Sequence, residues 1–393
     1  MHRQTRNGPA LCQPTDYRNG SVQAQLAQPA DLAITQSAGR QGTRSRVPAR
    51  ALAVLTVTLA LSASLQPPAV SAEELNLYSA RHYQTDERLY SEFTRKTGIR
   101  LKRIEAGDEA LLERIRNEGR NSPADVLLLV DAARLWKADR EGLFRPVRSD
   151  VLESRVPPER RAKAAPDGIT WFGLSSRARV IVYNRGRIDP SKISTYESLA
   201  DPSLKGQLCT RSAAHPYMLS LIAALSEHLG KPATERWAQG MVANFARSPR
   251  GGDTDQIKAV ASGECSVALT NTYYLVRLMR SAQPQDKATL DRIGMVWPNQ
   301  ATWGTHMNVT GGGVLKTSRN PTAALRFLEY LVSDEAQAWL AEGNNEWPVV
   351  PGVKTNNGAL DSLGLFKADA LPVEAIGAAQ STAAQLIDRV GWR

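Results

Sequence analysis

The sequence lacks the local motifs that mark several common enzyme classes. It holds no Gly-x-Ser-x-Gly elbow, no His-Glu-x-x-His pair and no Gly-x-x-x-x-Gly-Lys loop, so nothing in it favours a serine hydrolase, a zinc protease or a nucleotide-binding loop. The three glycines at 311–313 have no Lys-Ser/Thr after them at the spacing of such a loop, and we interpret them as a tight strand turn. We therefore predict that the protein is not an enzyme.

Cysteine is also scarce, with three residues in the whole chain. Cys209 and Cys265 each lie at or beside a predicted strand. Without nearby histidines, two cysteines make a poor zinc site. In an oxidising compartment they can form a disulfide, and two buried free thiols are the alternative.

The apolar run at 51–65 is too short for a comfortable membrane span, which needs about 20 residues. Arginines precede it, and a segment with small residues at 67–72 follows it. This order is typical of a secretory signal peptide, and a retained membrane anchor is the alternative. We predict that residues 1–72 are an N-terminal extension and a cleaved signal peptide, that the mature chain begins near Glu73, and that the protein is periplasmic.

The formal net charge of +10 overstates how basic the folded part is. Residues 1–72 hold seven arginines and two acids, which leaves 42 bases against 37 acids in the remainder. A mild excess spread along the chain indicates a solvated surface, so we expect no nucleic-acid partner.

From Glu73 onward, short apolar runs alternate with amphipathic helical patterns. This alternation predicts α/β lobes with parallel, doubly wound sheets covered on both faces. The expected lobes are residues 73–173 plus 304–393, and residues 174–303. Because the chain crosses twice between them, we expect a ligand cleft between the lobes. The predicted strands lie at 75–79, 99–104, 124–130, 177–184 and 267–270, and the clearest helices at 86–97, 108–118, 217–229, 234–245, 253–262 and 373–390.

Two pairs of ligand-type side chains follow predicted strands. Tyr273 and Tyr274 come after the strand at 267–270, and His82 and Tyr83 come after the strand at 75–79. In open α/β sheets the carboxyl ends of the strands face the ligand crevice. If Tyr273 and Tyr274 lie on the first turn of a helix, both side chains can reach one point. We predict that the fold brings the two pairs together.

Several segments in order resemble the periplasmic ferric-iron-binding proteins of ABC transporters, in the branch of cyanobacterial iron uptake. The resemblance covers roughly residues 74 to 355 and implies the two-lobed, type II periplasmic binding protein fold. The segments that carry it are Asn76-Leu77-Tyr78-Ser79-Ala80-Arg81-His82-Tyr83, Ser122-Pro123-Ala124-Asp125-Val126, Arg177-Ala178-Arg179-Val180-Ile181-Val182-Tyr183-Asn184, Cys209-Thr210-Arg211-Ser212, Asn271-Thr272-Tyr273-Tyr274 and Gly304-Thr305-His306-Met307-Asn308.

The resemblance also implies an iron ligand set. Members of this branch hold iron with a His-Tyr pair from one lobe and three tyrosines from the other. The matching residues here are His82, Tyr83, Tyr217, Tyr273 and Tyr274. The match around Tyr217 is less complete, and this makes His215 a second possible ligand.

The chemistry of these side chains agrees with iron(III), a hard cation that suits anionic oxygen ligands. Several phenolates around one ion overcompensate its charge, so we expect nearby arginines. Arg81, Arg177 and Arg277 are the candidates, with ordinary salt bridges as the alternative. We interpret Asp131 first as a helix cap and His306 as a satisfied core histidine.

The predicted function is therefore capture of Fe(3+) in an interlobe cleft and delivery to an inner-membrane ABC permease, by a protein expected to be monomeric. Metal binding would select the closed form by hinge closure. The alternative is an exported binding protein of the same fold for an organic anion, a polyamine or a sugar, because fold alone does not determine the ligand.

Overall fold

Residues 73–81 and 83–393 are described by a computed structural model. The signal peptide predicted within residues 1–72 lies outside these described residues, and so does His82. The strands are β1 (Glu74–Ser79), β2 (Arg100–Glu105), β3 (Val126–Leu129), β4 (Phe172–Asn184), β5 (Leu208–Cys209), β6 (Val267–Asn271), β7 (Ile293–Val296), β8 (Met307–Val314) and β9 (Trp347–Pro348).

Helices follow most of these strands, as the alternating pattern predicts. Those up to residue 243 are α1 (Asp86–Thr97), α2 (Asp108–Glu118), α3 (Ala132–Arg140), α4 (Asp150–Arg155), α5 (Pro216–Leu229) and α6 (Lys231–Ala243). Those after residue 243 are α7 (Asp253–Ser262), α8 (Thr272–Met279), α9 (Pro284–Arg292), α10 (Pro321–Leu331), α11 (Asp334–Asn344), α12 (Gly358–Asp361), α13 (Val373–Ala378) and α14 (Gln380–Val390).

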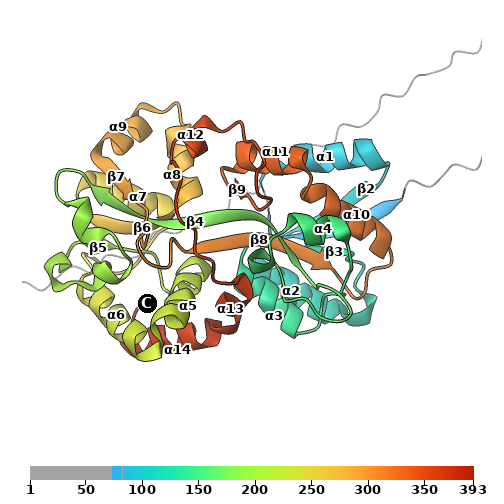
Figure 1. The fold of residues 1–393 in the computed structure, drawn as a ribbon, viewed down its shortest axis with the longest axis horizontal. Helices are drawn as coiled ribbons and strands as arrows, with labels where there is room; N and C mark the ends of the chain where they lie inside the picture. Colours follow the sequence, from blue (N-terminus) through green and yellow to red (C-terminus); the bar gives the residue numbers. More distant parts are fainter. Residues whose placement is uncertain (1–72, 82) are drawn as a thin grey trace, which may run out of the picture. The chain divides into compact units, whose positions relative to one another are not determined.

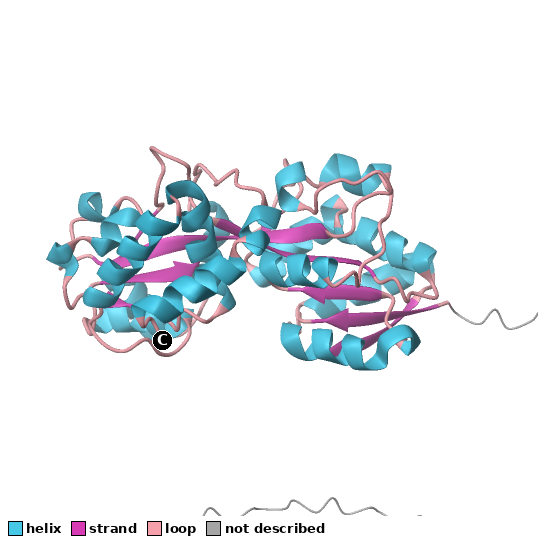
Figure 2. Cartoon of the chain, turned by 90° about the horizontal axis from the view of Figure 1, so that it is seen from below, coloured by secondary structure: helices cyan, strands magenta, loops and turns pink. Residues whose placement is uncertain are grey.

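The long strand β4 connects two halves of the sheet. The strand order is β2-β1-β3-β8-β4-β6-β5, with β7 and β9 also paired to β4. Near its start β4 pairs with β8 and β9, and near its end it pairs with β6 and β7. Figure 1 shows β4 running between the two groups of helices, and Figure 2 shows helices on both sides of the strands. The α/β architecture predicted from the sequence is confirmed.

The strand directions differ from the predicted all-parallel pairing. β1 is parallel to β2 and β3, but β8 runs antiparallel to both β3 and β4. The reason is topological, because β4 and β8 carry the chain in opposite directions between the two halves. A local periodicity shows that a strand is buried but not which neighbour it will meet.

The three glycines at 311–313 lie inside β8 and do not form the predicted strand turn. A Cβ atom on Gly311 would lie 2.5 Å from the carbonyl oxygen of Phe172. The glycines therefore let β8 approach its neighbours closely.

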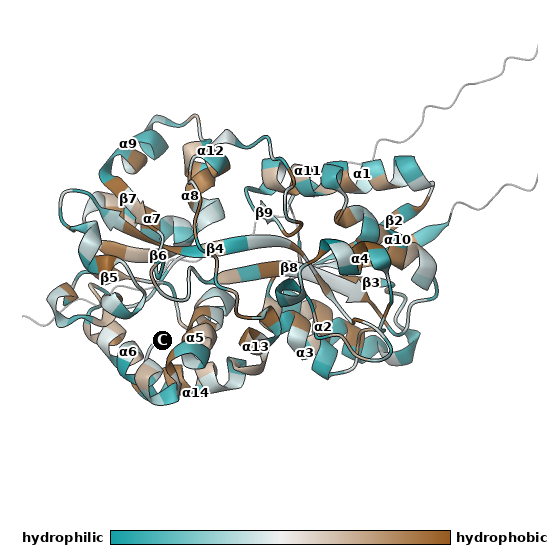
Figure 3. Cartoon of the chain, in the orientation of Figure 1, coloured by the Kyte–Doolittle hydropathy of each residue, from teal (hydrophilic) through white to brown (hydrophobic). Residues whose placement is uncertain are grey.

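The core follows the predicted patterns. β3 is buried at every position, and α1 buries Leu89, Tyr90 and Phe93, the face expected from its spacing. Figure 3 shows hydrophobic stretches on the strands and mixed hydropathy along the helices, as expected for helices that bury one face. Among the described residues, no helix combines the length and the apolar composition that a membrane span requires.

Two further predictions have clear outcomes. Cys209 and Cys265 form a disulfide that joins β5 to the residues before β6, so the free-thiol alternative is wrong.

The single C-terminal helix predicted over 373–390 is divided at Ala379 into α13 and α14, and α14 packs against α5 and α6. The lobe boundaries stay a prediction.

His306 is buried, as predicted, but it is not satisfied. The residue is 2% exposed, and its Nδ1 has no hydrogen-bond partner among the described residues. Burial lowers the pKa of His306 to about 3, and the neighbouring arginines Arg179 and Arg160 add to this. The ring is therefore neutral over the physiological pH range.

This lowered pKa predicts a loss of stability in acid. An unfolded histidine has a pKa near ~6.5, so between that pH and about 3 the unfolded chain binds a proton that folded His306 does not. Stability falls as pH falls through this window, and at pH 5 the His306 contribution to that loss is about 2 kcal/mol. We expect urea unfolding of His306→Leu to show a smaller fall between pH 7 and pH 5 than the wild type. An identical fall in both proteins would contradict the assignment.

Candidate metal centre

Three tyrosines predicted as ligands meet at the first turns of two helices. Tyr217 lies in the first turn of α5, and Tyr273 and Tyr274 lie in the first turn of α8, which follows β6 directly. The hydroxyl oxygens of Tyr217 and Tyr273 are 3.1 Å apart. The ring centroids of Tyr273 and Tyr274 are 4.2 Å apart. Residues 56 positions apart in sequence thus share one hydrogen bond.

Tyr83 joins this group from the loop between β1 and α1. Burial raises the pKa of Tyr83, and the charges of Glu346 and Tyr217 act in the same direction. Tyr83 in turn contributes to the raised pKa of Tyr273. These mutual effects show that Tyr83 is an electrostatic neighbour of Tyr217 and Tyr273. The other member of its pair, His82, lies outside the described residues.

Without a metal ion, Tyr217 and Tyr273 hold their protons. Burial raises the pKa of Tyr217, and it raises the pKa of Tyr273 well above the ordinary value, with neighbouring phenols adding to the latter shift. Burial disfavours the charged form of a phenol because a low-dielectric surrounding solvates a phenolate poorly. At neutral pH these phenols are therefore uncharged until a cation replaces their protons.

All three arginines predicted from the sequence lie over tyrosine rings. Measured from the guanidinium carbon to the ring centroid, Arg177 is 5.2 Å from Tyr217 and Arg81 is 5.3 Å from Tyr83. Arg277 is 5.9 Å from Tyr273 and 5.5 Å from Tyr274. Arg81 also forms a buried salt bridge with Asp86 at 2.8 Å, as the alternative expected, so its charge is compensated within the protein. Arg177 and Arg277 remain as positive charge beside the phenols.

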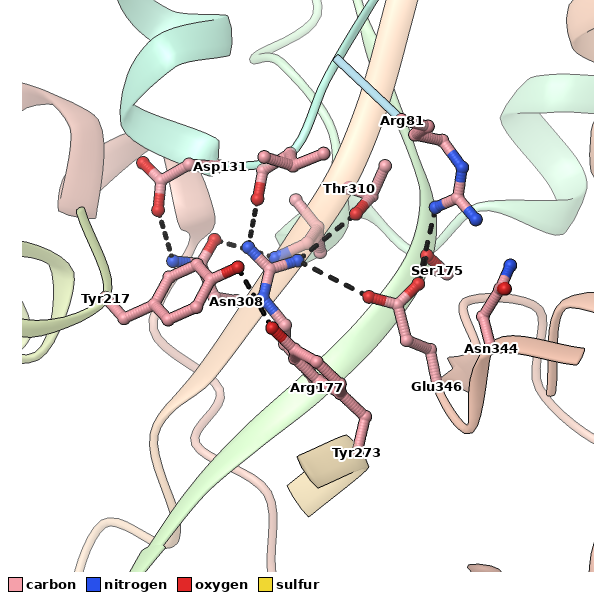
Figure 4. A network of polar contacts seen from close by, with 12 residues as sticks. Arg81, Asp131, Ser175, Arg177, Tyr217, Tyr273, Asn308, Thr310, Asn344 and Glu346 are labelled. Carbon is pink, nitrogen blue, oxygen red and sulfur yellow. Dashed lines mark hydrogen bonds and ion pairs between the residues drawn. The ribbon is translucent and has the colours of Figure 1, made fainter. Parts of the chain in front are cut away.

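Arg177 is held rigidly in this position. It is 1% exposed on β4, and its guanidinium donates to the Thr310 hydroxyl at 3.2 Å and to the Val130 carbonyl oxygen. Figure 4 shows its guanidinium beside Tyr217 and Tyr273. A buried guanidinium with several fixed partners keeps its charge and orientation.

Glu346 is the most important residue that sequence reasoning missed. It is 3% exposed, and its carboxylate accepts from Ser175 at 2.6 Å and from Arg81 at 3.3 Å. Its other oxygen lies 3.9 Å from Arg177. One carboxylate thus joins the loop of Tyr83 to β4 (Figure 4). Nothing local marks it in the sequence, because its partners are far away along the chain.

A second buried ion cluster lies behind Tyr217. Asp253, at the start of α7, is fully buried and lies 2.8 Å from Arg179 and 3.0 Å from Arg211. Although burial alone would raise the pKa of Asp253, the two arginines hold it below its ordinary value. The guanidinium carbon of Arg211 is 5.2 Å from the ring centroid of Tyr217. Arg211 is therefore a fourth arginine at the tyrosine group.

His215, the second possible ligand, and Asp131 both cap helices. His215 caps α5, since its Nδ1 accepts from the backbone N–H of Tyr217 at 3.2 Å. Burial, with help from Arg211, lowers the pKa of His215 to about 3, so the ring is neutral and carries its proton on Nε2. Asp131 caps α3 by accepting from the backbone N–H of Ala133, which confirms the cap interpretation.

The ligand chemistry of this group is distinctive. Within residues 73–81 and 83–393, no group of three or more His, Cys, Asp or Glu side chains is placed to hold a metal ion. The clustered oxygen donors are phenols. Deprotonated phenols are hard anionic ligands, which match a hard, highly charged cation better than a soft one.

Comparison with known proteins points to the same class of ligand. Residues 88–368 match the family model described as bacterial extracellular solute-binding protein. Iron uptake protein A1 of Synechocystis is 49% identical over 321 residues, which cover 82% of this chain and 88% of that protein. The Fe(3+)-binding periplasmic protein of Serratia marcescens is 27% identical over 78% of this chain and 87% of that protein.

Solved structures are similar over the same region. The FutA (IdiA) protein of Trichodesmium, in complex with iron and citrate ligands, is 49% identical with a TM-score of 0.77, and the match covers 81% of this chain and 100% of that chain. Apo FutA2 of Synechocystis is 47% identical with a TM-score of 0.77, and the match covers 82% of this chain and 100% of that chain.

The buried cluster behind Tyr217 predicts a large loss of stability on neutralising Asp253. Asp253→Asn leaves Arg179 without its carboxylate in a buried setting, and breaking a buried ion pair in this way costs about 3–5 kcal/mol. Urea unfolding of the metal-free protein measures the change. The matched control is Asp255→Asn on the same helix, where the exposed side chain only caps the Gly252 N–H; it should cost about 1 kcal/mol or less. Equal effects of the two substitutions would contradict the role of Asp253.

Proposed function

The chain belongs to the bacterial extracellular solute-binding proteins, in the branch that contains the iron uptake proteins, and we propose that it captures iron(III) in the periplasm for an ABC permease. It has the two-lobed, type II periplasmic binding protein fold. The observation that carries the proposal is the convergence of phenols, with the Tyr217 and Tyr273 hydroxyls 3.1 Å apart. The activity is binding and release, with no chemical turnover.

The proposed ligands are His82, Tyr83, Tyr217, Tyr273 and Tyr274. Four phenolates and one trivalent ion carry a net charge of −1, which is costly in a buried site. Arg177 and Arg277 lie next to these phenols and supply the opposite charge. The preference for a trivalent cation rests on the ligands, because hard anionic phenolates match a hard, highly charged cation.

The proposed lobes are residues 73–173 plus 304–393, and residues 174–303. Tyr83 then belongs to one lobe and the other three tyrosines to the second, so the ligand set is complete only when the lobes are closed. β4 and β8 connect the halves of the sheet and are the natural hinge. Iron would stabilise the closed form, which the permease recognises. We further propose that the protein reaches the periplasm through a signal peptide cleaved near Glu73 and acts as a monomer.

The first test uses the colour of iron bound to phenolates. Ferric iron added to the mature protein should produce a visible phenolate-to-iron charge-transfer band. The Tyr273→Phe, Tyr274→Phe double variant should lose most of this band. Its iron affinity should fall by more than ~100-fold, because outer-shell partners alone are worth 10–100-fold at metal sites.

The matched control is Tyr330→Phe. Tyr330 lies on α10, partly buried against Phe93, and belongs to none of the contacts around Tyr217. It should leave both the band and the affinity unchanged. If the double variant keeps the wild-type band and affinity, the ligand assignment is wrong.

The raised pKa values of Tyr83, Tyr217 and Tyr273 predict that iron binding releases protons. We expect about two or more protons per iron at pH 7, and therefore an affinity that falls by ~100-fold or more for each unit of acidification. Proton release in weakly buffered solution measures the first number. Competition against a chelator of known protonation measures the second. An affinity independent of pH between 8 and 6 would exclude phenol deprotonation on binding.

A further inference from the structure

Asp131 has a second set of contacts beyond its role as a helix cap. The residue is fully buried, and while its Oδ1 caps α3, its Oδ2 accepts from the Asn308 side-chain amide at 2.8 Å and lies 3.0 Å from the Ser220 hydroxyl. Ser220 belongs to α5, the helix that carries Tyr217. Figure 4 shows Asp131 facing Asn308 close to Tyr217. A single carboxylate therefore connects the end of β3 to the helix of a proposed ligand.

Ser220 passes this contact to the first turn of α5. Its hydroxyl oxygen is fully buried, accepts from the Asn308 amide at 2.8 Å and lies 2.5 Å from the carbonyl oxygen of Pro216. Pro216 directly precedes Tyr217. The hydroxyl proton points to the Asp131 carboxylate or to the Pro216 carbonyl, and both oxygens lie within reach of it.

Asn308 is fixed in turn by the backbone. Its side-chain oxygen accepts from the Ala132 N–H at 3.0 Å and from the Val309 N–H at 2.8 Å, so its amide nitrogen must point at Asp131 and Ser220. The three side chains therefore form a network in which every donor has an acceptor within reach, and only the Ser220 hydroxyl proton has two acceptors to choose from. None of the three is needed to fill the core, because apolar side chains would do that without desolvating a carboxylate.

We propose that Asp131 and Ser220 are positioning residues for the metal centre: they hold the first turn of α5, and with it the Tyr217 hydroxyl, in register with Tyr273. This inference rests on the proposed iron function. Asp131 lies in the first proposed lobe and Ser220 in the second, so the contact acts across the two lobes. When the lobes close, a helix turn held by this contact presents the Tyr217 hydroxyl in a fixed position, so less conformational freedom is lost on binding and binding is strengthened.

The test is a double-mutant cycle on iron affinity in the full mature protein, with ferric iron and a competing chelator. Ser220→Ala removes the hydroxyl and keeps a good helix former. We expect its iron dissociation constant to rise about tenfold, the effect of losing one hydrogen bond to a charged group. We also expect the charge-transfer band to shift, because the Tyr217 oxygen moves relative to the ion. In a Tyr217→Phe background, Ser220→Ala should have no further effect.

The matched control is Ser226→Ala on the same helix. Ser226 is also buried, but its hydroxyl donates only within α5, to the Ala223 carbonyl oxygen at 2.8 Å. It should leave affinity and band unchanged. Thermal unfolding of each metal-free variant shows whether the fold is kept, and Asp131→Asn, which retains the size of the side chain, should reproduce the effect of Ser220→Ala.

The outcomes separate this inference from the proposed function. If Tyr217→Phe weakens iron binding but Ser220→Ala does not, positioning by Ser220 is wrong and the ligand assignment stands. Equal effects of Ser220→Ala with and without the Tyr217 hydroxyl would also overturn the inference, because the network would then not act through Tyr217. If Tyr217→Phe itself leaves iron binding unchanged, the ligand assignment for Tyr217 fails first.

Discussion

The structure depends on keeping several phenol oxygens together in a largely buried place where ionising them is costly. Burial raises the pKa values of Tyr83, Tyr217 and Tyr273, so each phenol alone favours its neutral form. Their oxygens become strong ligands only when a cation supplies the field that removes the protons. A site of this kind responds to ion charge: the greater the charge of the cation, the more fully it offsets the cost of ionising the phenols.

The fold meets this requirement by placing three of the tyrosines in the first turns of helices. Tyr217 begins α5, while Tyr273 and Tyr274 begin α8, so three phenols lie at the amino-terminal ends of helices, where the partial positive charge of the backbone favours anions. Arg177 extends from β4 beside these phenols. Glu346, the residue just before β9, lies 3.9 Å from Arg177.

Much of this arrangement was predictable from the chain alone. The first turn of α8, the helix α1 and the cap role of Asp131 follow from local patterns that do not need tertiary context. The candidate arginines were also found, because phenolates near a cation need compensating charge. The sheet directions, the glycines inside β8 and the unpaired Nδ1 of His306 were not found, because each is decided by a neighbour distant in sequence.

The sequence by itself determined the alternation of strands and helices, the positions of the Tyr-Tyr and His-Tyr pairs and the family of binding proteins to which the chain belongs. These properties reside in short segments, whose periodicity and residue types are readable one stretch at a time. Only the tertiary structure decided that Tyr217 meets Tyr273, that Glu346 joins two arginines and that Asp131 reaches Ser220. Those contacts join residues 56 to 265 positions apart, and the packing of the whole sheet and its helices brings them together.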